Sequence, residues 1–591
     1  MSGVQTCQAM AKPPRRPPSE KKSSPPSNRA PRSGDRPKRP GRAPPRAGGG
    51  ERSARDEKPA GGERSARGEP SARGERAASG GKFSRDERPA RGGKFSRDDR
   101  PARGGKFSRD DRPARGGKFS RDDRPARGER FGRGKRSSRG ESADRGDAPP
   151  RERPIREDLV TQAALEAYAL VRQEGRLADR ALDFTLRRKA NLYSNERRAV
   201  AERVYALLRR QITVDYLLSK ARAGFSALTS GRQDLLRLCA SRVLHGEDAA
   251  DVAQSAGLSD EDARALDALP DAARSLNKLP EAQRFAISAA LPDFLATRFR
   301  AEFGAEAAAA AEALNERAPL TARVNTLKTD RDSLMARLRD EGIDCRPTPL
   351  SPLGVFLETR INAFSSPAFR EGLFELQDEG SQLLGMLVDP PPTRIVDACA
   401  GAGGKTLQLA MDMKNRGEIF ALDVDDGRLD ELRKRTRRAG VHNVRARVIP
   451  AEAAHDEGAL ADLAGKADRV LVDAPCSGTG TFRRKPDGRH RLKPEDLENH
   501  VARQKRLLAQ FSGMVKGGGR IIYGTCSMLR EENEAVVEHF LREHPQFQVK
   551  PISDVLGAEL GAKVSRDGFL RLFPHKHGTD GFFGAILVRT R

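Results

Sequence analysis

The sequence predicts an α/β protein in which a long basic arm and an all-helical domain precede a domain built around a parallel sheet. Three observations predict this. Residues 1–154 are rich in Pro, Arg, Gly and Ser, with too few aliphatic side chains to form a core. Helical spacing of apolar residues dominates 155–290. From residue 376 to the end, strand-like apolar runs alternate with amphipathic segments, which is typical of a parallel sheet covered by helices.

The arm carries most of the positive charge. Residues 1–150 contain 41 Lys and Arg against 20 Asp and Glu, which gives +21 of the net charge of +26. A twelve-residue unit, GGKFSRDERPAR, begins at Gly80 and recurs with one change at Gly92, Gly104 and Gly116. One Phe per unit gives no core face, so a solenoid is excluded. The arm either binds nucleic acid, with Phe stacking on bases and Arg following phosphates, or serves as a spacer.

Cysteine usage and hydropathy exclude several classes of protein. The six cysteines form no C-x-x-C pair, which argues against a zinc site and a disulfide scaffold and favours a reducing compartment. The first residues lack the apolar core of a secretory signal, and no run of about 18 apolar residues predicts a membrane span. We therefore expect a cytoplasmic, monomeric protein with no metal and no membrane partner.

Each predicted element follows from a local pattern. Helices are predicted within 157–175, 194–221, 231–244 and 248–257, then a strand and a capped helix within 319–343, and a strand at 354–360. In the last domain, the predicted strands are 393–400, 417–425, 444–452, 468–475 and 519–527, with helices at 404–415, 427–440, 494–516 and 530–544. Two late strands, 567–574 and 580–589, predict a closing antiparallel hairpin.

The unusual residues of this domain fall at or near the carboxyl ends of its predicted strands. They are Asp397 with the Gly-rich turn after it, Asp423, Glu452, Asp473 and Cys526. Ligands of parallel α/β sheets bind beyond these ends, so we expect one edge of the sheet to collect them.

The Gly-rich turn DACAGAGGKT (Asp397–Thr406) predicts a ligand held close to the backbone. It lacks the glycine spacing of a P-loop and the third glycine of the dinucleotide fingerprint, so neither a nucleoside triphosphate nor NAD is expected. Asp423, about twenty residues further on, is placed to hold ribose hydroxyls, or alternatively to cap a helix. Together these features favour an adenosine ligand without a pyrophosphate, such as S-adenosylmethionine.

Two cysteines each lie just past a predicted strand. Cys476 lies in DAPCSGTG directly after Asp473, and Cys526 ends the strand IIYGTCS. A lone strand-end cysteine is usually a buried small side chain, but two on one cleft favour covalent catalysis. Methylation at carbon 5 of a pyrimidine needs such a thiolate, since addition at carbon 6 activates carbon 5, and a carboxyl group at N3 stabilises the developing charge. The Arg-rich segment Phe482–Arg491 is either a phosphate clamp or a solvated loop.

At these residues the sequence resembles the RNA cytosine-5 methyltransferases over about 155–591. The family pattern D-x-C-A-A-P-G-G-K-T is similar to Asp397–Thr406, with Gly401 and Ala402 in place of Ala-Pro, and the Pro-Cys and Thr-Cys motifs are similar to DAPCSGTG and to TCS followed by EEN. The resemblance implies a class I, Rossmann-like S-adenosylmethionine-dependent domain in which Cys526 attacks, Cys476 aids release and Asp473 assists. It implies cofactor contacts at Cys399, Ala400, Gly401, Ala402, Gly403, Gly404, Lys405, Asp423, Glu452 and Asp473.

The segment SNERRAVAERVYALLRR resembles a NusB-type RNA-binding domain, and RVNTLK (Arg323–Lys328) and DGFF at Asp580 resemble parts of bacterial enzymes that methylate a cytosine of 16S ribosomal RNA. The implied organisation is an arm at 1–154, a NusB-like domain at 155–290, a small α/β linker at 291–375 and the methyltransferase domain at 376–591. Two alternatives stay open. One is the same chemistry on a transfer RNA or another ribosomal cytosine, and the other is a non-catalytic RNA-binding or ribosome-assembly factor.

Overall fold

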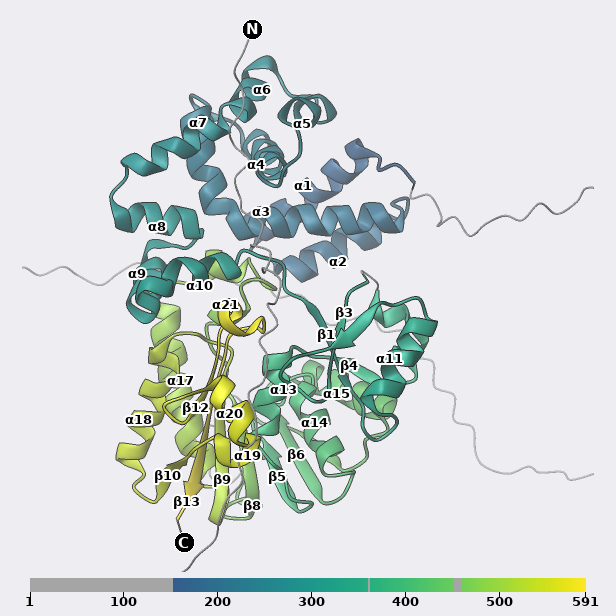
Figure 1. Ribbon diagram of the computed structural model, residues 1–591, viewed down its shortest axis with the longest axis vertical. Helices are drawn as coiled ribbons and strands as arrows, with labels where there is room; N and C mark the ends of the chain where they lie inside the picture. The colour runs from purple at the N-terminus through teal and green to yellow at the C-terminus, as the bar shows by residue number, and fades with distance from the viewer. Residues whose placement is uncertain (1–152, 360–361, 451–459, 591) are drawn as a thin grey trace, which may run out of the picture. The chain divides into compact units, whose positions relative to one another are not determined.

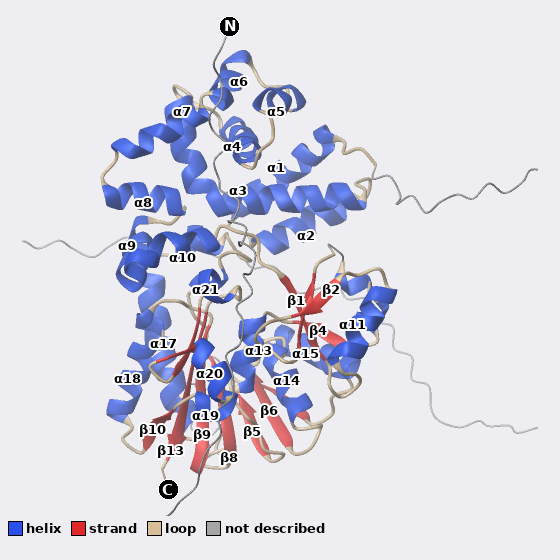
Figure 2. Ribbon diagram, in the orientation of Figure 1, coloured by secondary structure: helices blue, strands red, loops and turns tan. Residues whose placement is uncertain are grey.

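The computed structural model describes residues 153–359, 362–450 and 460–590. In this part of the chain, a group of helices leads into a small antiparallel sheet and then into a large mixed sheet with helices on its faces (Figures 1 and 2). Nearly all of the predicted basic arm, and Glu452, lie outside the described residues. None of the described helices is both long enough and apolar enough to cross a bilayer.

The first helices bury their apolar faces in two different places. They are α1 (Glu157–Glu174), α2 (Ala178–Arg188), α3 (Ser194–Ala221), α4 (Ser230–Leu244), α5 (Ala249–Ser255), α6 (Asp260–Asp267), α7 (Leu269–Arg274), α8 (Glu281–Ala289), α9 (Asp293–Phe303) and α10 (Ala307–Ala313). Helices α1 to α7 share one core, with Tyr168 and Leu207 fully buried in it. Helices α8 to α10 instead pack against Phe482, Met528 and Phe573 of the last part of the chain. The region after residue 290 therefore begins with two helices that belong to a different core from that of α1 to α7.

A small antiparallel sheet follows the helices. Its strand order is β2–β3–β1–β4, formed by β1 (Leu320–Val324), β2 (Cys345–Pro347), β3 (Gly354–Leu357) and β4 (Phe374–Leu376). Helix α11 (Arg331–Asp340) packs on it and begins as the sequence predicts, because the Asp330 carboxylate accepts the Ser333 N–H at 2.9 Å and caps the helix. The short helix α12 (Pro367–Arg370) precedes β4.

The large sheet has the strand order β11–β12–β13–β9–β8–β5–β6–β7, with β10 paired to β13. Its strands are β5 (Arg394–Asp397), β6 (Glu418–Asp423), β7 (Val444–Val448), β8 (Ala467–Asp473), β9 (Val515–Thr525), β10 (Phe547–Lys550), β11 (Ser565–Arg566), β12 (Phe569–Leu572) and β13 (Phe582–Arg589). The five strands β5 to β9 are parallel to their neighbours among them, and β13 runs antiparallel to β9 and β12. This confirms the α/β class and the closing hairpin that the sequence predicts.

Helices cover both faces of this sheet, and two apolar cores lie between the layers (Figure 2). The helices are α13 (Glu379–Met386), α14 (Gly404–Asp412), α15 (Asp426–Ala439), α16 (Gly488–Arg491), α17 (Pro494–Ser512), α18 (Glu534–Glu543), α19 (Ser553–Leu556), α20 (Ala558–Val564) and α21 (Pro574–His577). The strand order reverses at β5, because β6 and β7 follow on one side of it and β8 and β9 on the other. Such a switch point is where open α/β sheets bind ligands.

Candidate active site

The predicted acids and thiols gather at the carboxyl edge of the parallel strands. Asp397 ends β5, Asp423 ends β6, Asp473 ends β8, and Cys526 directly follows β9. The strand register places Asp397 opposite Leu471, two residues before Asp473 on β8, and Asp473 opposite Gly524 of β9, so these ends lie at the same edge of the sheet. The edge that the sequence predicted therefore exists, with the switch point between β5 and β8 at its centre.

The Gly-rich turn between β5 and α14 leaves room for a ligand. Gly401 and Gly403 have φ values of 53° and 84°, a region that favours glycine. A Cβ atom at Gly403 would lie 2.0 Å from Leu432, whereas a Cβ at Gly401 would have no atom within 4 Å. Gly403 is thus favoured by its φ value, and a larger residue there would also displace the end of the Leu432 side chain, while Gly401 borders open space. The Gly401 N–H donates to the Asp423 carboxylate at 2.7 Å, which joins the turn to the end of β6.

Asp473 and Lys405 form an ion pair across the turn. Their Nζ and Oδ2 atoms are 2.6 Å apart, and Lys405 is buried while about 30% of the Asp473 side chain is exposed. The ammonium group also lies 5.6 Å from the centre of the Phe582 ring. Lys405 therefore fixes the orientation of the Asp473 carboxylate and leaves part of that carboxylate open to a ligand.

Asp397 is held differently from the other acids. It is almost fully buried, Thr406 donates to its Oδ2 at 2.6 Å, and its Oδ1 has no hydrogen-bond partner among the described residues. Burial raises the pKa of the Asp397 carboxyl to about 7, and the negative charge of Asp473 adds to this effect. An unpartnered buried oxygen under the Gly-rich turn is consistent with a polar ligand at this position.

The two thiols lie in contact. The Sγ atoms of Cys476 and Cys526 are 3.4 Å apart, and both side chains are partly exposed. The hydrogen bond between them and burial raise the pKa of the Cys476 thiol well above its usual range. Cys526 is thus neither sealed in the interior nor distant from the other strand ends.

A buried carboxylate, which the sequence indicated only as part of the segment EEN, joins the loops of the two cysteines. Glu532 is fully buried and accepts the N–H of Ser477 at 2.8 Å, the Ser477 hydroxyl, and the side-chain amide of Gln504 at 3.0 Å. Gln504 also donates to the backbone carbonyl of Pro475 at 3.0 Å. The residues on both sides of Cys476 are therefore held by groups that follow Cys526 or lie on α17. Sequence reasoning missed Gln504, whose position in a regular amphipathic helix gives no signal.

A second set of contacts closes the same loops from the other side. The Gly480 N–H donates to the Cys526 carbonyl at 3.0 Å, and the Gly581 N–H donates to the Gly480 carbonyl at 2.9 Å. A Cβ atom at Gly480 would lie 2.3 Å from the Gly581 carbonyl oxygen. The segment DGFF thus packs directly on the Cys476 loop, which explains why glycine is needed at both positions.

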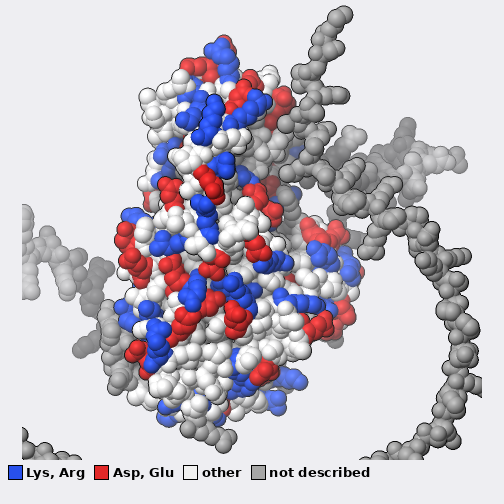
Figure 3. Space-filling model, turned by 60° about the vertical axis from the view of Figure 1, so that its left-hand side comes forward, with Lys and Arg blue, Asp and Glu red and all other residues white. Residues whose placement is uncertain are grey.

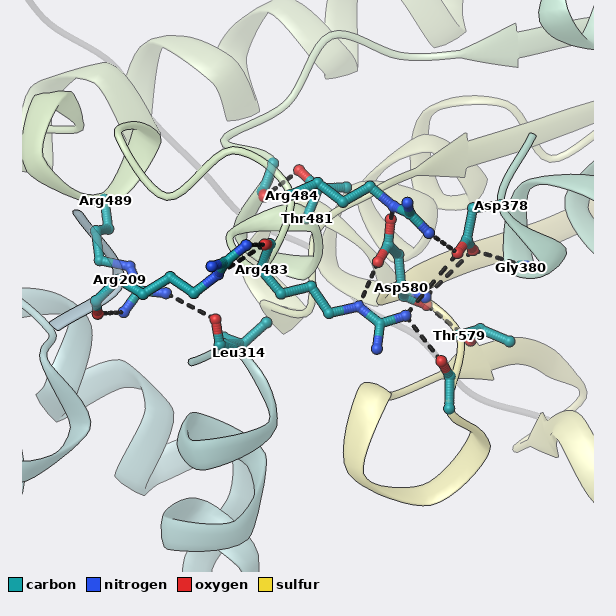
Figure 4. Close-up of polar contacts among 12 residues, drawn as sticks. Arg209, Leu314, Asp378, Gly380, Thr481, Arg483, Arg484, Arg489, Thr579 and Asp580 are labelled. Atoms are coloured by element: carbon teal, nitrogen blue, oxygen red, sulfur yellow. Dashed lines mark hydrogen bonds and ion pairs between the residues drawn. The ribbon is translucent and has the colours of Figure 1, made fainter. Parts of the chain in front are cut away.

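The Arg-rich segment Phe482–Arg491 is not a solvated loop as a whole, because Arg483 and Arg489 are buried and are not available to a phosphate, whereas Lys485 and Arg491 are exposed. Arg483 and Arg484 each donate to Asp580 at 2.5 Å, and Arg484 also donates to Asp378 at 2.7 Å (Figure 4). Arg489 has no exposed surface. The side chains of Arg483, Arg484 and Arg489 point into the protein because this loop lies between the large sheet and the preceding helices.

Arg489 reaches into the helical part of the chain. It donates to the backbone carbonyls of Arg209 and Leu314 at 2.9 and 3.0 Å (Figure 4). It also donates to the side-chain oxygen of Asn315 at 2.6 Å. In return, Arg209 donates to the backbone carbonyl of Arg483 at 2.9 Å. The loop after Cys476 is therefore attached to α3 and to the end of α10.

The small sheet supports the Gly-rich turn from behind. Arg323, in the segment RVNTLK, is fully buried and donates to the carbonyl of Gly404 at 2.8 Å, and Asn325 donates to the carbonyls of Gly372 and Ala439. Burial lowers the pKa of the Arg323 guanidinium to about 10. These two side chains connect the linker region to the start of α14 and the end of α15.

Comparison with known proteins agrees with this geometry. Residues 386–588 match the family model described as 16S rRNA methyltransferase RsmB/F, and residues 291–363 match the ferredoxin-like domain of RsmF/B-like methyltransferases. The chain is 30% identical over 455 residues to a protein of Bacillus subtilis named probable ribosomal RNA small subunit methyltransferase B, covering 73% of this chain and 98% of that protein. A probable ribosomal RNA small subunit methyltransferase B of Synechocystis is also 30% identical, over 70% of this chain and 95% of its own length.

Among solved structures, the crystal structure of PH0851 superimposes with a TM-score of 0.60 at 26% identity, covering 74% of this chain and 99% of that one. The sequence match thus extends over nearly the whole length of two relatives, and the fold match over nearly the whole of a solved structure. The chain therefore belongs to the 16S rRNA methyltransferase RsmB/F family and is an S-adenosylmethionine-dependent methyltransferase.

Proposed function

We propose that this enzyme methylates carbon 5 of a cytosine in 16S ribosomal RNA through a covalent adduct with Cys526. The observation that carries the proposal is the pair of partly exposed thiols, 3.4 Å apart, at the edge of the sheet that also holds Asp473 and the Gly-rich turn. Membership in a family described as acting on 16S rRNA supports the choice of substrate. An RNA-binding or assembly factor without catalysis would have no need of this arrangement.

The residues of the Gly-rich turn fit S-adenosylmethionine. The open space beside Gly401 and the unpartnered Oδ1 of Asp397 mark the place for a polar ligand next to the turn. When bound, S-adenosylmethionine supplies an electrophilic methyl group. We assign its binding to Cys399, Ala400, Gly401, Ala402, Gly403, Gly404, Lys405, Asp423 and Asp473, and we keep Glu452, which lies outside the described residues, as a further contact. The helical segment 155–290 is assigned to RNA binding.

The chemistry begins at Cys526. The Cys526 thiolate adds to carbon 6 of the target cytosine, and the electron pair of the 5,6 double bond is delocalised toward N3. Asp473 contacts N3, and a proton passes from the Lys405–Asp473 pair to N3 as the negative charge builds there. Carbon 5 is now nucleophilic and takes the methyl group. The proton on carbon 5 then passes to solvent, the N3 proton returns to the Lys405–Asp473 pair, and the 5,6 double bond re-forms as the Cys526 sulfur leaves carbon 6 as a thiolate.

Cys476 assists the last step. Its raised pKa keeps it protonated at neutral pH, so it presents an S–H group to the sulfur of Cys526. A thiol in that position hydrogen-bonds to the leaving thiolate and favours its departure. Cys476 must be held in place for this role, which is what its neighbours Pro475 and Ser477 achieve through Gln504 and Glu532.

The test uses 16S ribosomal RNA from cells that lack this protein. Cys526→Ala should abolish methyl transfer while S-adenosylmethionine binding persists. Cys476→Ala should accumulate an RNA–protein adduct that survives denaturation. RNA that contains 5-fluorocytidine should trap the wild-type adduct, because carbon 5 then has no proton to lose, whereas 5-fluorouridine RNA should not.

Three results would contradict the proposal. Turnover by Cys526→Ala would exclude its role as the nucleophile. Normal turnover by Cys476→Ala without any adduct would remove its role in release. An adduct with 5-fluorouridine RNA alone would show that the target is a uridine.

A further inference from the structure

A groove borders the Cys476 loop on the side of α17. It has a volume of about 470 Å³, and one of its walls is formed by residues of α16 and of the turn after it. The other wall is one face of α17, where His500, Arg503 and Arg506 succeed each other at helical spacing. Ser477, the residue after Cys476, also lines the groove. The groove therefore ends one residue from the proposed active site.

The groove has a local surplus of positive charge. Arg503 and Arg506 are exposed and make no ion pair or hydrogen bond to any described residue. Arg491 is paired with Asp487 at 3.0 Å, and the one acid in the lining, Asp496, accepts the Lys493 N–H at 3.0 Å as a helix cap. The face shown in Figure 3 carries acidic and basic side chains interspersed, with no single broad basic field. The groove therefore differs from that mixed surface, because two of its arginines, Arg503 and Arg506, have no acidic partner among the described residues.

The same helix that presents these arginines holds the catalytic loop. Gln504 lies between them in sequence but points inward, where its amide contacts the Pro475 carbonyl and Glu532 at 3.0 Å each. Arg503 and Arg506 lie about one helical turn, or roughly 5 Å of rise, apart on the outer face. An anion bound by them would be placed in a fixed relation to Cys476 through a single rigid element.

We propose that this groove binds the phosphate backbone of single-stranded RNA next to the target nucleotide. The inference rests on the proposed function, because it takes the Cys476 loop as the place where the base is modified. A base that is taken out of its stack leaves its flanking phosphates against the protein, and paired cations beside the reactive thiols are suited to receive them. An acidic protein segment has the same charge, but nothing would direct it to a groove that reaches Ser477, the residue after Cys476.

The test compares three double variants. Arg503→Gln with Arg506→Gln removes both charges at exposed positions, where substitution leaves the fold intact. Arg503→Lys with Arg506→Lys keeps the charges. Lys414→Gln with Arg416→Gln removes two exposed charges at the opposite edge of the sheet, before β6.

The measurement is binding of a fluorescent oligocytidylate as a function of salt concentration. Each phosphate contact in a single strand contributes about 0.7 to the slope of log affinity against log salt, so the glutamine pair at 503 and 506 should reduce the slope by about 1.4. Between 1 M and 0.1 M salt, the affinity of the wild-type protein should therefore rise about 25-fold more than that of the glutamine pair. The lysine pair should keep the wild-type slope, and so should the control pair at 414 and 416 because it lies far from the groove. With 16S ribosomal RNA as substrate, the glutamine pair should raise KM and leave kcat unchanged.

Each outcome has one meaning. An unchanged salt slope in the glutamine pair would overturn the groove assignment, even if Cys526 forms its adduct normally. An equal reduction of the salt slope in the control pair at 414 and 416 would overturn it as well, because the reduction would then follow from net charge and not from the groove. If the wild-type protein forms no Cys526 adduct but the glutamine pair still reduces the salt slope, the proposed chemistry is overturned and the groove remains an RNA site.

Discussion

Replacing Asp397 by Asn should remove a pH-dependent loss of stability from the enzyme without ligand. Asp397 is 1% exposed, and its Oδ1 has no partner among the described residues, so ionisation of this carboxyl in the folded protein is costly. Its folded-state pKa is about 7, against an ordinary value of 3.8. The folded protein therefore binds a proton more tightly than the unfolded chain does. The stability that this provides is complete below about pH 4 and is lost as the pH rises to about 7.

The difference between the folded-state and ordinary pKa values of Asp397 sets the size of the pH-dependent change in the free energy of unfolding. At 1.36 kcal/mol per pH unit, it corresponds to a loss of about 4 kcal/mol between pH 4 and pH 8, of which about 3 kcal/mol falls above pH 5. The asparagine oxygen still accepts from Thr406, whereas its NH₂ group takes the position of Oδ1, where no acceptor is present. That leaves a pH-independent penalty of about 1–3 kcal/mol. The two effects are separable, since only the first changes with pH.

Urea denaturation at a series of pH values between 5 and 8 measures this. The free energy of unfolding of Asp397→Asn relative to wild type should rise by about 3 kcal/mol across that range, because all other titrating groups are common to both proteins. Asp567→Asn, at an exposed side chain, is the matched control and should follow the wild-type curve. Parallel curves for Asp397→Asn and wild type would show that the carboxyl is ionised in the folded protein throughout, and would refute the reasoning.

Two further substitutions test the contacts around the Cys476 loop. Gly480→Ala places a Cβ atom 2.3 Å from the Gly581 carbonyl oxygen, and because backbone cannot move aside cheaply, we expect about 3 kcal/mol of destabilisation and a strong loss of turnover. Gly231→Ala, where a Cβ would meet no atom within 4 Å and φ is not positive, is a control for the clash, and equal destabilisation in the two variants would contradict the packing argument. Arg489→Met leaves three backbone carbonyls and the Asn315 oxygen without their donor, which should cost about 1–3 kcal/mol for each acceptor that stays buried and unpaired, and should expose α10 to proteolysis. Lys485→Met, at an exposed side chain of the same segment, is the control and should stay within about 0.5 kcal/mol of wild type.

The strand ends could be predicted because each one combines two local signals. An apolar run that stops at Asp397, Asp423 or Asp473 fixes both the strand and the residue at its end, and parallel topology then brings the ends together. The same logic placed Cys476 and Cys526 just past two strand ends and in one cleft, and the structure brings their Sγ atoms to 3.4 Å from each other. The arm and Glu452 stay predictions, because they lie outside the described residues.

The partners of the polar side chains could not be predicted in the same way. Phe482–Arg491 has the composition of a surface loop, and only the packing of α8 to α10 against it turns Arg489 inward. Likewise, Gln504 and Glu532 lie in regular helical or acidic patterns, and their contact with each other arises from the way α17 crosses the sheet. Composition reports the charge of a side chain, but burial and pairing depend on residues that are distant in sequence.

The buried arginines also connect the helical part of the chain to the chemistry. Arg489 joins the loop after Cys476 to the carbonyls of Arg209 and Leu314, and Arg483 joins the same loop to Asp580 beside the Gly480–Gly581 contact. If Arg483 lost Asp580 its buried charge would be unpaired, and if Arg489 moved, its acceptors would be left buried without a donor, so a shift at either end of this connection is costly. The position of the helices α3 and α10 and the position of Cys476 are therefore set together, and RNA held by the helices would meet the thiols at a fixed distance.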